Sequence, residues 1–120
     1  MSSGYEQPRS WLVYLAEMVE FCEKVLQYTE GLGQQAFFDN ALVYDATIRN
    51  ITLIGEAAAQ VPGPVRATQE NVPWQAIVAT RNHMMHRYYA IDETITWSII
   101  TSDIPELLPY LRNMLRSVRE

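Results

Sequence analysis

The fold is decided by residues 34–60, which read QQAFFDNALVYDATIRNITLIGEAAAQ. Apolar or small residues recur in this stretch at steps of four and three, at Phe37, Ala41, Tyr44, Ile48, Ile51 and Gly55. Such spacing places them all on one face of an α-helix. Residues 34–60 are therefore predicted to form one long amphipathic helix.

Three positions of this helix indicate its surroundings. Gly55 lies in the helix interior, where glycine costs about 1 kcal/mol relative to alanine, so we expect a neighbouring helix to approach closely there. Asp45 and Arg49 are four residues apart and can form an ion pair on the exposed side of the helix.

Helical patterns continue on both sides of this stretch. Residues 10–29 carry an apolar stripe made of Trp11, Leu15, Met18, Cys22 and Val25. Gly31 is expected to stop that first helix. Pro62, Gly63 and Pro64 end the second helix, and Pro73 opens a third helix within its first turn. The inner stripe of the third helix is formed by Trp74, Ile77, Val78, Arg81, Met84, Met85 and Tyr88.

The C-terminal part is also helical in pattern. Asp92 is expected to cap a short helix that runs through Ile100. Asp103 and Glu106 form a capping-box pattern for the last helix, and Pro109 is expected to kink that helix or delay its start. No stretch alternates as a strand does. The sequence predicts an all-α, antiparallel helical bundle of about five to six helices, in a single domain spanning residues 1–120.

Composition limits the classes of partner. No apolar run approaches the roughly 20 residues of a membrane-spanning helix, so no membrane partner is expected. The lone thiol of Cys22 fits a protein core in a reducing compartment, and the first residues do not resemble a secretory signal, so a cytoplasmic location is expected. The net charge of -5 and the pI of about 5.0 argue against bulk attraction to DNA or RNA. A small local phosphate site remains open.

Both histidines lie in one polar stretch, TRNHMMHRYY, residues 80–89. Arg81 falls on the inner helical stripe, where a charged group needs a partner or a bound phosphate to offset its desolvation. A buried arginine paired with Glu56 or Asp45 would explain the same pattern.

His83 and His86 are three residues apart, but no suitably spaced carboxylate or cysteine completes a ligand set, so neither a metal nor another cofactor is expected. The three tryptophans are interpreted as core anchors rather than base-stacking platforms: Trp11, Trp74 and Trp97.

The segment Arg81-x4-His86-x-Tyr88 resembles the R-x4-H-x-Y signature of the HepT-like toxins, a branch of the HEPN ribonuclease superfamily. The resemblance extends over most of the chain. It includes Arg49-Asn50-Ile51 and Ile54-Gly55-Glu56-Ala57 in the second helix, Trp74, Arg81-Asn82 and residues 88–92 around the motif, and Asp103-Ile104-Pro105 at the start of the last helix.

The resemblance implies the toxin of a type VII-like HepT/MntA toxin–antitoxin system, a homodimeric, metal-independent endoribonuclease that cleaves mRNA or tRNA. Its implied partner is an MNT-type nucleotidyltransferase antitoxin, which neutralises the toxin by AMPylation of the motif tyrosine. By position that tyrosine is Tyr88, Arg81 and His86 are the catalytic pair, and Asn82 is a supporting residue. His83 and Tyr89 repeat the residue types of neighbouring motif positions, so the roles within each pair stay open.

The chemistry can also be argued from the residues. RNA cleavage by its own 2′-hydroxyl needs a base, an acid for the leaving 5′-oxygen, and positive charge at the phosphorane. Histidine serves for either proton transfer near neutral pH, and arginine binds phosphate oxygens bidentately. One chain carries a single motif histidine, whereas a two-fold dimer carries two. The active site is therefore expected at a homodimer interface. The AMPylation that the resemblance implies requires the Tyr88 hydroxyl to reach solvent, so Tyr88 is expected at the mouth of the cleft.

Two alternatives are left open by the sequence. The domain could be a non-catalytic helical module that binds substrate and docks onto a nucleotidyltransferase, although such a module does not need both Arg81 and His86. A basic stripe on the last helix, formed by Arg112, Arg116 and Arg119, is either a solvated face or a rim that guides RNA. No DNA partner is expected.

Overall fold

The computed structural model describes residues 10–86 and 92–119, without the side chains of His83, Met85, His86 and Arg119. Every regular element in these residues is helical, which confirms the predicted all-α fold. Six α-helices are longer than one turn: α1 (Trp11–Thr29), α2 (Gln34–Asp39), α3 (Ala41–Ala59), α5 (Trp74–His86), α6 (Glu93–Ser98) and α7 (Ile104–Arg119). The single turn α4 (Gly63–Arg66) and the π-helical turn η2 (Ile99–Asp103) complete the described elements.

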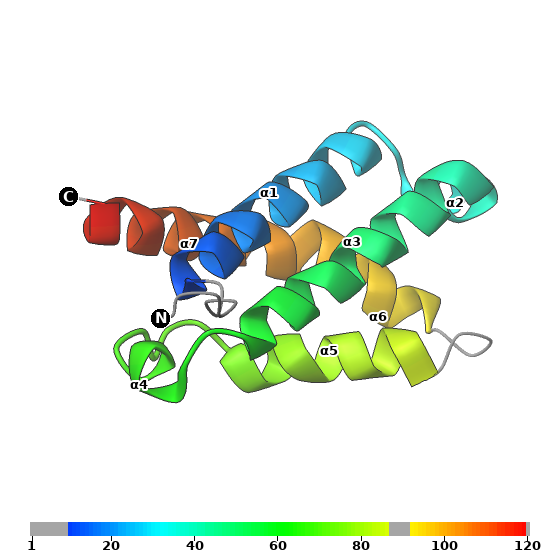
Figure 1. Cartoon of the computed structure of the whole chain (residues 1–120). Coiled ribbons are helices and arrows are strands. Elements are labelled where there is room, and N and C mark those ends of the chain that lie inside the picture. The colour runs from blue at the N-terminus through cyan, green and yellow to red at the C-terminus, as the bar shows by residue number, and fades with distance from the viewer. Residues whose placement is uncertain (1–9, 87–91, 120) are drawn as a thin grey trace, which may run out of the picture.

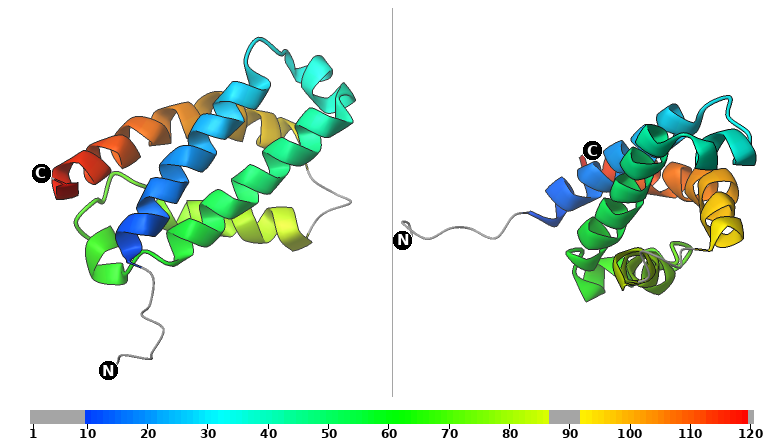
Figure 2. Two further views of the ribbon diagram at one scale, coloured as in Figure 1. Left: turned by 45° about the horizontal axis from the view of Figure 1, so that its top comes forward. Right: turned by 90° about the vertical axis from the view of Figure 1, so that its right-hand side faces the viewer.

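The four longest helices form an antiparallel bundle. The chain runs in alternating directions along α1, α3, α5 and α7 (Figure 1). α3 lies in the middle and packs extensively against both α1 and α5, and α1 packs in turn against α7 (Figure 2). The apolar core fills the space between these helices and includes the fully buried side chains of Leu15, Met18, Phe37 and Leu111. The predicted antiparallel helical bundle is therefore confirmed.

The first helix follows its prediction closely. Ser10 caps α1, because its hydroxyl accepts a hydrogen bond from the backbone N–H of Leu12 at 3.2 Å. The predicted stripe faces inward, and its members Leu15, Met18, Cys22 and Val25 are buried. Gly31, at a φ of 76°, takes the left-handed conformation that ends many helices.

The single helix predicted for residues 34–60 is wrong, because the chain breaks at Asn40. This residue leaves the helical conformation, at φ -100° and ψ 95°, and separates α2 from α3. Its side-chain Oδ1 accepts a hydrogen bond from the backbone N–H of Val43 at 3.1 Å and so caps the new helix. The apolar face continues across the break, since Phe37 before it and Ile48 and Ile51 after it are buried.

Gly55 lies at the crossing of α3 and α5, as its position in the sequence predicted. A Cβ atom placed on Gly55 would clash with the Cβ of Arg81 and would lie 3.0 Å from the carbonyl oxygen of Ile77. The obstructing atoms belong to the backbone and the first side-chain carbon of α5, which cannot swing aside. The two helices therefore approach this closely only because residue 55 has no side chain.

The predicted break before the last helix is also wrong. Asp92 caps α6 as expected, with its Oδ1 accepting from the N–H of Ile95 at 3.0 Å. Beyond α6, however, the chain continues through η2 directly into α7, and the N–H of Ile104 bonds to the carbonyl oxygen of Ile99. Asp103 therefore lies inside a helical rod and does not cap one. Pro105 has no N–H to continue the α-helical pattern, and the wider π turn precedes it.

Two smaller predictions concern Pro109 and the pair Asp45 and Arg49. Pro109 lies inside α7 and so does not delay the start of that helix, and the alternative of a kink stays a prediction. No ion pair joins Asp45 to Arg49 within the part of the chain that the structure describes. Arg66, for which no role was predicted, donates from its guanidinium to the carbonyl oxygens of Val61 at 2.8 Å and Ala58 at 3.0 Å. Arg66 thereby satisfies backbone groups at the C-terminal end of α3.

The tryptophans support the core, as predicted. Trp74 is buried, and Trp11 and Trp97 pack against the core from its edge. The ring of Trp97 lies 5.6 Å from that of Phe37, measured between centroids, and joins α6 to α2. Among the described residues, no helix combines the length and apolar character needed to cross a membrane.

Replacing Gly55 with alanine should destabilise the protein by about 1 to 3 kcal/mol, because the added methyl group overpacks the α3–α5 crossing. In an exposed helix the same change would stabilise the protein by about 1 kcal/mol. A decrease in the free energy of unfolding therefore indicates that the helices are in close contact at residue 55. Urea unfolding followed by circular dichroism measures the effect. Gly33→Ala is the matched control, since an added Cβ there meets no atom within 4 Å. A Gly55→Ala protein as stable as the wild type would contradict the close approach.

Candidate active site

The candidate site lies on the C-terminal half of α5, which begins where α5 crosses α3. The Cβ of Arg81 lies directly over Gly55, so the stem of Arg81 packs on α3 while its guanidinium extends toward the surface. Arg81 is partly buried, and Met84, one turn further along α5, is buried in the core. The α3–α5 contact thus fixes where the arginine leaves the helix.

The guanidinium of Arg81 is held by its neighbour. Its Nε and Nη2 atoms donate to the side-chain Oδ1 of Asn82, at 3.1 and 2.8 Å. The alternative of an ion pair with Glu56 or Asp45 is wrong, because neither carboxylate bonds to Arg81 within the described residues. The two residues that the sequence placed side by side are therefore joined through their side chains.

This arrangement leaves the positive charge of Arg81 available. The Asn82 amide is neutral, so it orients the guanidinium without neutralising it. These bonds use two of the five N–H groups of the arginine, and no other described side chain bonds to the remaining three, which can donate to an anion. A planar, oriented guanidinium beside a helix is well suited to bind two oxygens of a phosphate group.

The remaining motif residues are only partly covered. His86 is the last residue of α5, five positions after Arg81, and its side chain lies outside the described residues. The same holds for the side chain of His83, while Tyr88 and Tyr89 lie outside the described residues altogether. The geometry of the site therefore rests on Arg81 and Asn82, and the roles of His86 and Tyr88 stay predictions.

Two other chemical possibilities can be examined in the structure. Among the described residues, no three histidine, cysteine or acidic side chains gather as metal ligands would. Cys22 is fully buried in the core, and burial, followed by the charge of Glu23, raises the pKa of its thiol to about 12. The thiol is thus protonated near neutral pH, which excludes Cys22 as a nucleophile in the folded protein.

One arginine of the basic stripe on α7 forms an ion pair with another helix. Nη2 of Arg112 lies 2.8 Å from Oε2 of Glu23 and joins α7 to α1. Arg116 is exposed, and the side chain of Arg119 lies outside the described residues. One arginine of the stripe therefore supports the α1–α7 packing, which favours a solvated face over a continuous RNA-guiding rim.

Comparison with known proteins identifies a family that spans most of the chain. The family model described as "Ribonuclease HepT-like" matches residues 18–114, which include α3 and α5 completely. The chain belongs to the HepT-like ribonuclease family. The match covers Gly55, Arg81 and Asn82, and it confirms the resemblance predicted from the motif Arg81-x4-His86-x-Tyr88.

Three curated relatives match the chain at comparable identity. A candidate RNase of Methanocaldococcus jannaschii is 31% identical over 94 residues, covering 78% of this chain and 86% of the relative. A protein of the same organism, named as a gamma-glutamylcyclotransferase and candidate RNase, is 32% identical over 79% of this chain and 43% of its own length. A candidate RNase of Caldanaerobacter subterraneus is 28% identical over 86% of this chain and 92% of the relative. No solved structure gives a significant match.

In this HepT-like chain, Cys22 should resist alkylation by iodoacetamide at neutral pH for as long as the protein is folded. The reason is that the thiol is buried and its pKa is raised to about 12, so the reactive thiolate is scarce. Mass spectrometry should show complete alkylation only in denaturant. Rapid labelling of a protein whose circular dichroism stays native would contradict the burial of Cys22.

Proposed function

We propose that this HepT-like protein is a metal-independent endoribonuclease that acts as a homodimer, with Arg81 and His86 as its catalytic residues. The observation that supports the proposal is the state of Arg81, whose guanidinium is oriented by the neutral amide of Asn82 and bonded to no described carboxylate. Membership of a ribonuclease family and the RNase names of the relatives agree with it.

In the proposed reaction, the 2′-hydroxyl oxygen of the RNA attacks the adjacent phosphorus, and a motif histidine accepts the hydroxyl proton. The bond from phosphorus to the 5′-oxygen breaks, and the second histidine donates a proton to that leaving oxygen. The products are a 2′,3′-cyclic phosphate and a 5′-hydroxyl. Arg81 stabilises the additional negative charge on the phosphorane oxygens.

The dimer supplies what one chain lacks. His86 is the single motif histidine of a chain, so acid and base come from the two copies of α5 brought together at a two-fold axis. Two copies of Arg81 would give a local cationic site on a protein whose net charge is -5. Such a site binds phosphate without a basic surface over the whole molecule.

The proposed partner is an MNT-type nucleotidyltransferase antitoxin in a cytoplasmic type VII-like toxin–antitoxin system, with mRNA or tRNA as the substrate. In the neutralising step, the Tyr88 oxygen attacks the α-phosphorus of ATP and releases pyrophosphate. The attached AMP adds a negative charge and a bulky base beside Arg81, which would exclude the RNA phosphate.

The purified chain should cleave total RNA in the presence of a chelator and leave cyclic phosphate ends. Arg81→Ala and His86→Ala should each lower the cleavage rate by about a hundredfold or more, because each removes a group that acts in the transition state. Gel analysis and end-group chemistry measure both results. Arg116→Ala and His83→Ala are matched controls that should keep activity.

Two outcomes would contradict the nuclease. Loss of cleavage in chelator would exclude a metal-independent reaction. Absence of cleavage by protein whose mass shows an unmodified Tyr88 would favour the non-catalytic docking module. Cleavage per subunit that stays constant on dilution below the dimer dissociation range would exclude an active site shared between two copies.

Incubation with ATP and the MNT-type nucleotidyltransferase should add one or more AMP units to the wild type and abolish its RNA cleavage. Tyr89→Phe should be modified in the same way, whereas Tyr88→Phe should not, because only the motif tyrosine is the proposed acceptor. Intact mass measures the number of AMP units added, and peptide mapping identifies the residue that carries them. AMP mapped to Tyr89, or to another residue, would refute the assignment.

A further inference from the structure

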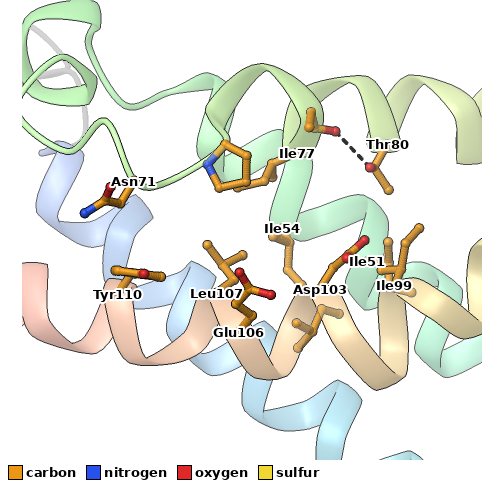
Figure 3. A pocket seen from close by; sticks show the side chains of 13 residues that line it. Ile51, Ile54, Asn71, Ile77, Thr80, Ile99, Asp103, Glu106, Leu107 and Tyr110 are labelled. Atoms are coloured by element: carbon orange, nitrogen blue, oxygen red, sulfur yellow. Dashed lines mark hydrogen bonds between the residues drawn. The ribbon is translucent and has the colours of Figure 1, made fainter.

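A groove separates α5 from α7 on the side of the bundle away from α1. It encloses about 310 Å³ and is floored by Ile51 and Ile54 of α3 (Figure 3). One wall comes from α5 and the residues before it, including Ala76, Ile77 and Thr80. The opposite wall comes from η2 and α7, with Ile99, Asp103, Ile104, Glu106, Leu107 and Tyr110.

The groove exists because the bundle is open along one edge. α5 packs mainly on α3, and α7 packs on α1, so the facing sides of α5 and α7 are left apart. The wall from Ile99 to Tyr110 spans about 16 Å at the rise of a helix. The lining therefore follows about three turns of helix, a length along which a segment of polypeptide can lie.

The lining of the groove is apolar at the bottom and acidic at one rim. The isoleucine and leucine side chains form its floor and walls, and Asp103 and Glu106 stand on the η2–α7 side. Neither carboxylate has a hydrogen bond or an ion pair within the described residues, and no basic side chain lines the groove. Burial, followed by the neighbouring charge of Glu106, raises the pKa of the Asp103 carboxyl. Among the residues that the structure describes, the rim therefore has no partner for its charge.

We propose that this groove is a docking site for a segment of a partner protein that carries an arginine or lysine among apolar residues. Apolar side chains of the segment would occupy the floor between α5 and α7. The basic side chain would lie with its aliphatic stem along Leu107 and its charged end between Asp103 and Glu106. Charge complementarity at the rim selects a basic segment over an acidic one.

A second copy of this chain is a less suitable occupant. The proposed homodimer brings the two copies of α5 together at Arg81, whereas the groove faces α7. The docking site also differs from the proposed nuclease site, because it faces α7 whereas Arg81 lies over α3. The inference therefore holds or fails independently of RNA cleavage.

The test is a selection of random short peptides, displayed on phage, against the full-length folded chain. Selected peptides should combine apolar residues with arginine or lysine, and their affinity is then measured by fluorescence anisotropy. Asp103→Asn together with Glu106→Gln should weaken binding at least about tenfold, since both charges of the rim are lost. Ala76→Trp, which fills the groove from an exposed position of α5, should abolish binding.

The matched control removes two charges elsewhere. Glu30→Gln together with Asp45→Asn changes two exposed carboxylates outside the groove and should leave the affinity unchanged. Circular dichroism and urea unfolding establish that every variant is folded. The rim variant is expected to fold, because burial and Glu106 already disfavour the charged form of Asp103.

Several results would overturn the proposal. These are the selection of no peptide, the selection of acidic or purely apolar peptides, and binding that survives Ala76→Trp in a folded protein. A homodimer that dissociates on Ala76→Trp would assign the groove to a second copy. A chain that binds basic peptides but cleaves no RNA would support the groove while contradicting the proposed nuclease.

Discussion

The contact between Gly55 and Arg81 determines how closely α5 packs on α3. α5 packs mainly on α3, so this crossing determines where the motif helix lies. The absent side chain of Gly55 lets the Cβ of Arg81 lie directly on α3, and the guanidinium then extends outward to Asn82. One glycine thus sets the distance between α3 and α5, and with it the distance of the Arg81 guanidinium from α3.

The order of helices could be predicted because amphipathic spacing and capping residues are local. Gly31 and Asp92 act at the helix ends where the sequence placed them. The two errors concern residues whose local preferences are ambiguous. Asn40 lies in an unbroken apolar period, yet its side chain competes for a backbone N–H and starts a new helix. Asp103 has the pattern of a cap, yet the chain before it stays helical through a π turn.

The sequence could predict only the part of the candidate site that is linear in the chain. The motif placed Arg81 and Asn82 side by side, and the structure joins their side chains, while their catalytic roles stay predictions. The interpretation of Arg81 as a buried, ion-paired residue was wrong. Helical periodicity predicts the face of the helix on which a residue lies, but not how much of its side chain is buried. At the α3–α5 crossing the stem alone is covered, so the charge needs no carboxylate. The groove could not be predicted from the sequence, because it depends on the distance between α5 and α7. That distance is set by how each of the two helices packs on other helices, which local sequence patterns do not determine.

α5 connects the two candidate sites of the molecule. Ile77 and Thr80 line the groove, and Ile77 also lies against Gly55, one turn before Arg81. A segment bound in the groove would bridge α5 to η2 and α7 and add a second support to a helix that now packs mainly on α3. Such a bridge restricts the motion of α5, and with it the position of the guanidinium. Coupling between docking and phosphate binding would then need no direct contact between the two ligands, because both act on the same helix.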